Sequence, residues 1–123
     1  MNTSRAQAIA QTYIEAIARK DVETIVSISA ADVVCTSPLG QITGIDSFRG
    51  FHDGFARMLT NVTVLAVYGD DKQAVVVYDV QTHPVPHAVV AERITIKDGK
   101  LASTDVIYDA TPFATYAASA QAH

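Results

Sequence analysis

The chain has 123 residues with 9 lysines and arginines against 13 aspartates and glutamates, which gives a net charge of −4 at pH 7. This negative charge argues against nucleic acid as a partner, and a hydrophobic content of 49% argues against a disordered chain. The length predicts one domain, residues 1–123, around a single core. The chain has no apolar run of the roughly 18 residues that span a membrane, and its first residues lack the apolar segment of a signal peptide. We therefore expect a small neutral or apolar ligand, no membrane partner and a cytoplasmic location.

Two helices are predicted at the start of the chain. Thr3 or Ser4 can cap the first helix. Its apolar face has the helical spacing of three and four residues and carries Ile9, Tyr13, Ile14 and Ile17. Asp21 can cap a second, shorter helix that ends near residues 30–32, where the strand-like segment VVCTS begins. The two helices should form a hairpin.

A third helix is predicted after the strand that Pro38 ends. Asp46 is its expected cap, and its apolar face is rich in aromatic residues. The members of that face are Phe48, Phe51, Phe55, Met58 and Leu59. These three N-terminal helices would supply one layer of the domain.

The pattern changes to alternation from Asn61 onward, which predicts strands VTVLAVY and QAVVVYDVQT, a loop HPVPH, and a hairpin AERITIKDGKLASTDVIYD. Helices followed by a strand meander indicate an α+β fold, in which one curved antiparallel sheet packs its concave face on three helices. Such layers leave room for an internal pocket, where small α+β proteins usually bind ligands.

This order of elements, the segment ADVVCTSPLG at residues 31–40, Tyr13 in the first helix and the ending DGKL…YD at residues 98–109 resemble the nuclear transport factor 2-like superfamily. Within it the chain is most similar to ketosteroid isomerase and the SnoaL-like proteins, over about residues 3–113. The resemblance implies a cone-shaped barrel with an apolar cavity and a homodimer formed across the sheet. It is specific for the fold and weak for the function.

The resemblance also implies roles for three residues. Tyr13 occupies the place of the oxyanion-hole tyrosine of ketosteroid isomerase, and Glu92 occupies the place of the protonated acid that completes that hole. Ser37, just before Pro38, occupies the place of the catalytic base, an aspartate in that enzyme. A serine hydroxyl does not accept a proton at neutral pH without a base of its own, which argues against steroid isomerisation. Half of an enolate-stabilising site remains, with two donors for one carbonyl oxygen.

The final hairpin has two possible registers. If Asp98 and Gly99 form a two-residue type I′ turn, Glu92 lies opposite Asp105, and both carboxylates face the same way. If Gly99 instead forms a bulge, every later residue changes face, Glu92 joins Val106, and Asp105 moves to the outer face, diagonal to Arg93. Hydrophobic counting does not separate the two registers. The resemblance favours the bulge, with Glu92 facing the cavity.

Three residues are candidates for the missing base. His52 lies beside the aromatic face of the third helix, although the edge of that face favours a surface position. Asp79 should face outward, because its neighbour Tyr78 matches the cavity face of the relatives; Asp105 would serve only in the unbulged register. His83 and His87 have a zinc-like spacing but no third ligand near them, so we expect no metal and no cofactor.

Two functions fit these observations. The first is an isomerase, cyclase or lyase for an apolar carbonyl compound, with Tyr13 and Glu92 as catalytic residues. The second is a noncatalytic domain that binds a small apolar ligand. In both, the expected ligand-binding residues are Ser37, Phe55, Met58, Tyr78, Val90, Val106 and Tyr108. The outer sheet face should form the homodimer, with Arg93 close to Asp105 of its own or the partner chain.

Overall fold

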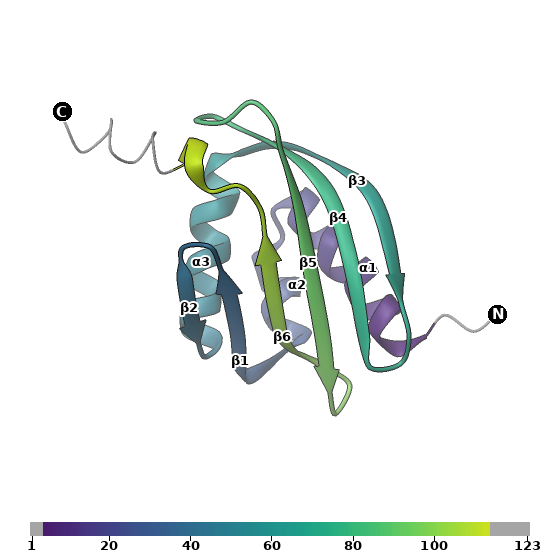
Figure 1. Ribbon diagram of the computed structural model, residues 1–123. Helices are drawn as coiled ribbons and strands as arrows, with labels where there is room; N and C mark the ends of the chain where they lie inside the picture. Colours follow the sequence, from purple (N-terminus) through teal and green to yellow (C-terminus); the bar gives the residue numbers. More distant parts are fainter. Residues whose placement is uncertain (1–3, 114–123) are drawn as a thin grey trace.

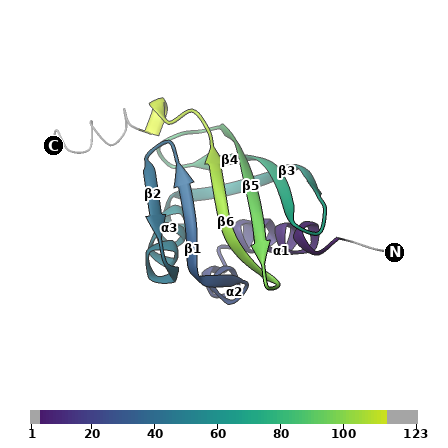
Figure 2. The ribbon, with the colours of Figure 1, turned by 60° about the horizontal axis from the view of Figure 1, so that its bottom comes forward.

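A computed structural model describes residues 4–113 of the chain. The helices and strands follow in the order α1 (Arg5–Arg19), α2 (Val22–Ser27), β1 (Ser29–Ser37), β2 (Gly40–Thr43), α3 (Ile45–Met58), β3 (Leu59–Gly69), β4 (Gln73–Thr82), β5 (Ala88–Lys97) and β6 (Lys100–Ile107). The strands form one six-stranded sheet in the order β2-β1-β6-β5-β4-β3. The sheet curls around the helices, which all lie on its concave side (Figures 1 and 2). The predicted α+β class is confirmed.

One pair of strands departs from the expected antiparallel sheet. The strands β1 and β6 pair in parallel, whereas every other neighbouring pair is antiparallel. The alternation of apolar and polar residues reports which faces of a strand are buried but not the direction of its neighbour, so the segment VVCTS gave no signal of this pairing. The parallel pair places the hairpin of β1 and β2 beside α3 and extends the sheet past the end of the meander.

The core lies between the concave face of the sheet and the helices. The helix α1 packs on β3 and β4, and α3 packs on β1. The largest fully buried side chains include Tyr13, Ile14, Ile25, Phe48, Leu59, Ile94 and Leu101. One acidic side chain, that of Glu92, is buried among them and is only 2% exposed. Among the described residues, no helix has the length and apolar character needed to cross a membrane.

The register of the final hairpin combines features of both alternatives. Asp98 and Gly99 have positive φ angles of 54° and 77°, and Ile96 pairs with Leu101, as a two-residue type I′ turn requires. The bulge comes later, because the next pair joins Thr95 to Ser103 and leaves Ala102 without a partner. A bulge is therefore present, but at Ala102 rather than at Gly99.

The bulge resolves a conflict between two sets of apolar side chains on β6. The positions of Leu101 and Val106 differ by an odd number, five, so a regular strand would point the two side chains to opposite faces. Both are buried, since the bulged Ala102 shifts the alternation by one residue. As predicted, Glu92 and Val106 share the inner face and Arg93 and Asp105 face outward, with Arg93 directly opposite Asp105 rather than diagonal to it.

The helix caps are only partly as predicted. The Asp21 carboxylate accepts hydrogen bonds from the Thr24 amide at 3.1 Å and the Thr24 hydroxyl at 2.7 Å, so it caps α2. Ser4 stands at the N-cap of α1, but its hydroxyl donates to the Gly69 carbonyl instead. The N-cap of α3 is Gly44, and Asp46 lies within the first turn instead. The φ of Gly44 is 97°, a backbone conformation that favours glycine.

Asp21→Ala should lower the free energy of unfolding by about 1 kcal/mol, because the substitution leaves the first amides of α2 without their cap. The control is Asp46→Ala, which removes only an acidic residue near a helix start and should cost no more than about 0.5 kcal/mol. Urea denaturation of both variants measures the difference. Equal losses would contradict the assignment of the two caps.

Candidate active site

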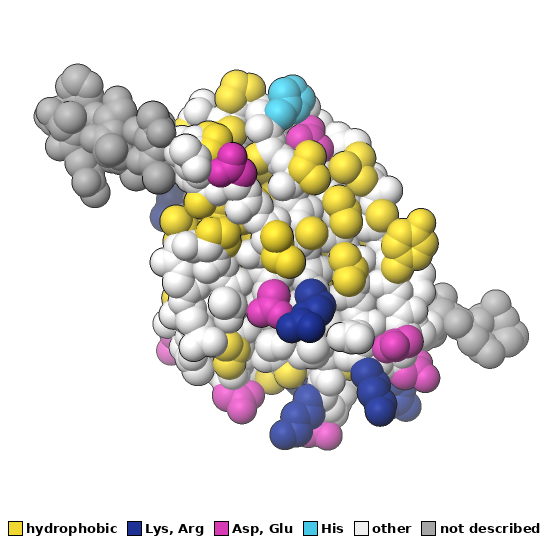
Figure 3. Space-filling model, in the orientation of Figure 1, with side chains coloured by type: hydrophobic (Ala, Val, Ile, Leu, Met, Phe, Trp, Pro, Cys, Tyr) yellow, Lys and Arg dark blue, Asp and Glu magenta, His cyan; other side chains and the backbone are white. Residues whose placement is uncertain are grey.

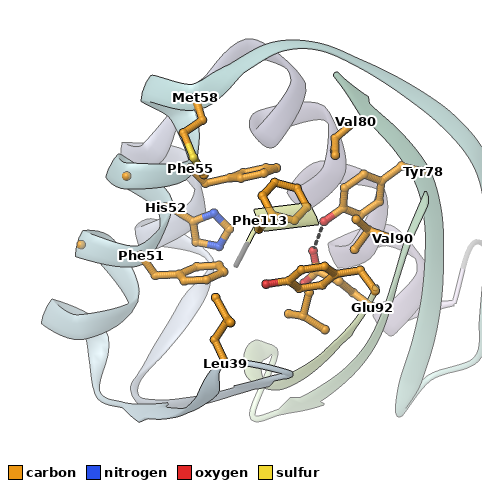
Figure 4. Close-up of a pocket in the computed structure, with 14 residues that line it drawn as sticks. Leu39, Phe51, His52, Phe55, Met58, Tyr78, Val80, Val90, Glu92 and Phe113 are labelled. Carbon is orange, nitrogen blue, oxygen red and sulfur yellow. Dashed lines mark hydrogen bonds between the residues drawn. The ribbon is translucent and has the colours of Figure 1, made fainter. Parts of the chain in front are cut away.

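A cavity of about 480 Å³ lies between α3 and the inner face of the sheet. Figure 4 shows Phe51, His52 and Phe55 projecting from α3 toward Tyr78, Val90 and Glu92 on the sheet. The lining consists of Leu39, Gly50, Phe51, His52, Gly54, Phe55, Met58, Tyr78, Val80, Val90, Glu92, Val106, Tyr108 and Phe113. The wall is mostly apolar, so its few polar side chains, at His52, Tyr78, Glu92 and Tyr108, would orient a ligand.

Most of the residues expected at the ligand do line this cavity. Phe55, Met58, Tyr78, Val90, Val106 and Tyr108 are all among its lining residues. Ser37 is not. It is the last residue of β1, and its hydroxyl accepts a hydrogen bond from the Leu39 amide at 3.1 Å in the turn to β2. The position of Ser37 before Pro38 thus serves the turn. The neighbouring Leu39 reaches the cavity instead.

Glu92 lies at the centre of a buried network of hydroxyl groups. Its Oε1 accepts hydrogen bonds from the Tyr13 hydroxyl at 2.8 Å and from the Thr104 hydroxyl at 2.7 Å, and its Oε2 accepts one from the Tyr78 hydroxyl. Burial raises the pKa of Glu92, although the three hydroxyl donors lower it in part. The group is thus closer to its neutral form than an exposed glutamate.

Tyr13 lies behind Glu92 and not at the cavity. It is completely buried and absent from the cavity lining, so its hydroxyl meets Glu92 rather than a ligand. Burial and the nearby Glu92 raise its pKa well above the usual value, which keeps the hydroxyl protonated. Tyr78 supplies the hydroxyl at the cavity wall that the resemblance had implied for Tyr13 (Figure 4).

His52 is another residue that the sequence interpretation placed wrongly. It is only 3% exposed and lines the cavity, whereas a surface position had been favoured. Its ring makes edge contacts with Phe48 and Phe51 at centroid distances of 4.6 and 5.2 Å, and its Nε2 lies 3.1 Å from the Tyr13 hydroxyl oxygen. The sequence did contain a signal for this buried position: His52 follows Phe48 by four residues, a spacing that puts both rings on the same face of a helix.

Desolvation by burial lowers the pKa of His52 from 6.5 to about 3. The imidazole is therefore neutral at physiological pH, with one nitrogen that carries a proton and one that accepts a hydrogen bond. It meets Glu92 only through Tyr13. The three side chains come from α3, α1 and β5, and a hydrogen-bonded chain joins them.

The other candidate bases lie outside the cavity. Asp79 faces outward as predicted, and its Oδ2 is 3.0 Å from His87 Nδ1. The Asp105 carboxylate accepts a hydrogen bond from Arg93 Nε at 3.0 Å on the outer face. Among residues 4–113, no three histidine, cysteine or acidic side chains are grouped as a metal site would require.

The neutral state of His52 predicts a loss of stability in acid. Its folded pKa of about 3 lies below its unfolded value of 6.5, so its contribution is complete above pH 6.5 and falls progressively as the pH drops toward 3. His52→Gln should reduce this loss, at about 1.4 kcal/mol per pKa unit. Urea denaturation from pH 4 to 8 measures it, with the exposed His83→Gln as the control. If the free energy of unfolding falls equally with decreasing pH in both variants, the assignment of His52 as a buried, neutral residue is wrong.

Solved structures with this fold are numerous. A protein from Kribbella flavida DSM 17836 is 36% identical, with a TM-score of 0.90 over 98% of this chain and 100% of that one. An NTF2-like protein from Cytophaga hutchinsonii is 12% identical, with a TM-score of 0.77 over 91% and 96%. An LEH-like epoxide hydrolase from M. tuberculosis is 13% identical, with a TM-score of 0.73 over 91% and 88%. The last two show the fold alone.

No match was found among curated proteins. The model of the SnoaL-like domain matches residues 10–104, which include Tyr13, Glu92 and most of the cavity wall. This match covers most of the chain, and the 36% identity to the Kribbella protein extends over nearly all of it. The chain belongs to the SnoaL-like domain family, within the NTF2-like fold.

Proposed function

We propose that the protein is a small-molecule enzyme of the isomerase, cyclase or lyase kind that acts on an apolar carbonyl compound in its cavity. The observation that carries this proposal is Glu92, a buried carboxyl group with a raised pKa at the wall of a largely apolar pocket. Perturbed acids in such places are typical of active sites. The cavity would exclude water and strengthen any hydrogen bond to the substrate.

A neutral Glu92 would change the direction of one hydrogen bond. With a proton on Oε2, the carboxylic acid donates to the Tyr78 oxygen, and the Tyr78 O–H becomes free to donate toward the cavity. Tyr78 would then hold the carbonyl oxygen while charge develops on it. Tyr13 and Thr104 continue to donate to Oε1 and fix the carboxyl group in place.

The second candidate function is noncatalytic binding of a small apolar molecule. Both oxygens of Glu92 already have hydroxyl partners within the protein, and Ser37 lies away from the cavity. A fully satisfied polar group can serve the core alone. The two functions differ in whether bound ketones exchange their α-protons.

The bicyclic ketone 2-tetralone tests the two functions, because it is apolar and has readily removed α-protons. We expect the protein to bind it and to catalyse α-proton exchange in D₂O, both followed by ¹H NMR. Glu92→Gln should bind it similarly but exchange on the order of a hundredfold more slowly, since an amide cannot pass a proton to Tyr78. Binding without exchange would favour the noncatalytic function, and failure to bind would contradict the proposed ligand class.

We also propose a homodimer through the outer face of the sheet. Tyr68, Val75, Arg93 and Asp105 form one row across β3 to β6 on this face. Apolar side chains gather over it (Figure 3), and Tyr68, Val89 and Ile107 are 74%, 59% and 61% exposed. An exposed apolar area of this kind, with one charged pair, suits a two-fold contact.

Ile107→Asp should weaken this dimer by at least about tenfold, because it would bury an unpaired carboxylate in the contact. Sedimentation velocity at several protein concentrations measures the effect. Ala18→Asp, on the exposed side of α1, is the matched control and should leave the dimer intact. Ketone binding should persist in both variants. An Ile107→Asp protein that sediments like the unmodified one would exclude this face.

A further inference from the structure

Four side chains form a continuous hydrogen-bonded chain through the core. His52 Nε2 lies 3.1 Å from the Tyr13 hydroxyl oxygen, and the Tyr13 hydroxyl donates to Glu92 Oε1 at 2.8 Å. On the far side of the same carboxyl group, Oε2 contacts the Tyr78 hydroxyl. The chain begins on α3, passes through α1 and β5, and ends on β4.

Both ends of this chain face the same cavity. Tyr78 and His52 line the cavity from opposite sides, with α3 on one side and the sheet on the other (Figure 4). The middle member, Tyr13, does not line it. A substrate between α3 and the sheet can therefore contact the two ends without touching the middle.

The free nitrogen of His52 supports this arrangement. Among the residues that the structure describes, the only hydrogen-bond partner of its ring is the Tyr13 hydroxyl, at Nε2. Within residues 4–113, no fully buried side-chain nitrogen or oxygen lacks a partner, so Nδ1 must have accessible surface. Because the residue is 3% exposed and lines the cavity, that surface belongs to the cavity.

We propose that His52, Tyr13, Glu92 and Tyr78 form a proton relay that removes a proton from the α-carbon of a ketone at His52 and delivers one to its oxygen at Tyr78. The relay rests on the proposed enzymatic function and assigns its base. The substrate class is an enolisable apolar ketone, because its oxygen and its α-hydrogen must meet the two ends together.

The transfer balances at every atom. The α-C–H bond breaks and its proton goes to His52 Nδ1, while the Nε2 proton moves to the Tyr13 oxygen and the Tyr13 proton moves to Glu92 Oε1. The proton on Glu92 Oε2 moves to the Tyr78 oxygen, and the Tyr78 proton moves to the substrate oxygen. The C–H electron pair becomes the C=C bond of the enol. While the enol is bound, the proton on Nδ1 exchanges with solvent. The enol is then protonated at carbon from Nδ1 and the other transfers reverse, so in D₂O the relay returns to its start with deuterium at the α-carbon.

The relay needs no charged intermediate. As separate groups, a histidine whose pKa is lowered by burial would be a weak base, and a glutamate whose pKa is raised by burial would be a weak acid. Here His52 loses one proton as it gains another, and so does Glu92. In an apolar cavity, a path that avoids charge separation is favoured because isolated charges are costly there.

Thr104 provides a matched control for Tyr13. Both hydroxyls are buried and donate to the same atom, Glu92 Oε1, at 2.7 and 2.8 Å. Only Tyr13 also contacts His52, so Thr104 lies off the path between the two ends. Thr104→Val keeps the shape of the side chain and removes its hydrogen bond.

The experiment compares exchange of the α-protons of 2-tetralone in D₂O with its dissociation constant, both by ¹H NMR. Tyr13→Phe should slow exchange on the order of a hundredfold with an unchanged dissociation constant. Thr104→Val removes one hydrogen bond that holds Glu92 but leaves the path intact, so it should slow exchange by no more than about tenfold. Tyr78→Phe, at the other end of the relay, should slow the exchange of α-protons as much as Tyr13→Phe does. The double variant Tyr13→Phe with His52→Gln should be no slower than the slower single one, because the two residues act as a unit.

The relay is wrong if the Tyr13→Phe variant catalyses exchange at the rate of the unmodified protein. It is also wrong if Thr104→Val slows exchange as much as Tyr13→Phe. The second result would mean that both hydroxyls merely hold Glu92. If the unmodified protein exchanges and Glu92→Gln is slow while Tyr13→Phe is not, the relay fails and the proposed enzymatic function stands. If the unmodified protein binds the ketone without exchange, the enzymatic function itself fails.

Discussion

A carboxyl group within the core is the constraint on which much of this structure depends. An unpaired buried carboxylate is costly, so the fold must surround Glu92 with donors. It does so with hydroxyls from three elements, namely Tyr13 of α1, Tyr78 of β4 and Thr104 of β6. The network ties the helix layer to the sheet at one point, because hydroxyls of α1, β4 and β6 meet at the same carboxyl group.

The apolar character of the cavity and the neutral state of its polar groups have a common cause. The aromatic face of α3 surrounds His52 with Phe48 and Phe51, and the resulting desolvation lowers the pKa of the imidazole. The same exclusion of water raises the pKa of Glu92. A single environment thus lowers the pKa of a base and raises the pKa of an acid, and each shift is toward the uncharged form of its group.

The sequence predicted the layers of the fold well, because periodicity reports burial directly. The three helices, the strand meander and the inward position of Glu92 all follow from it or from the family resemblance. The position of His52 was missed, since one polar residue on an aromatic face is ambiguous until the packing of neighbouring helices is known. The bulge at Ala102 was also placed at the wrong residue. Alternation within one strand cannot locate the point where its phase changes, although Leu101 and Val106 together show that a change must occur.

The irregularity at Ala102 has an effect on shape as well as on register. The neighbouring strand β1 is irregular at the same level, between Ser29 and Val34. Bulges bend strands and increase their twist, so two adjacent ones act as a crease across the sheet. Beyond this crease the hairpin of β1 and β2 folds toward α3, and Leu39 reaches the end of the cavity. The extra residue at Ala102 therefore places Val106 opposite Glu92, and together with the irregularity of β1 it bends the sheet at the side of the cavity that Leu39 lines, so a change at this crease would alter the surroundings of the acid and the shape of the pocket together.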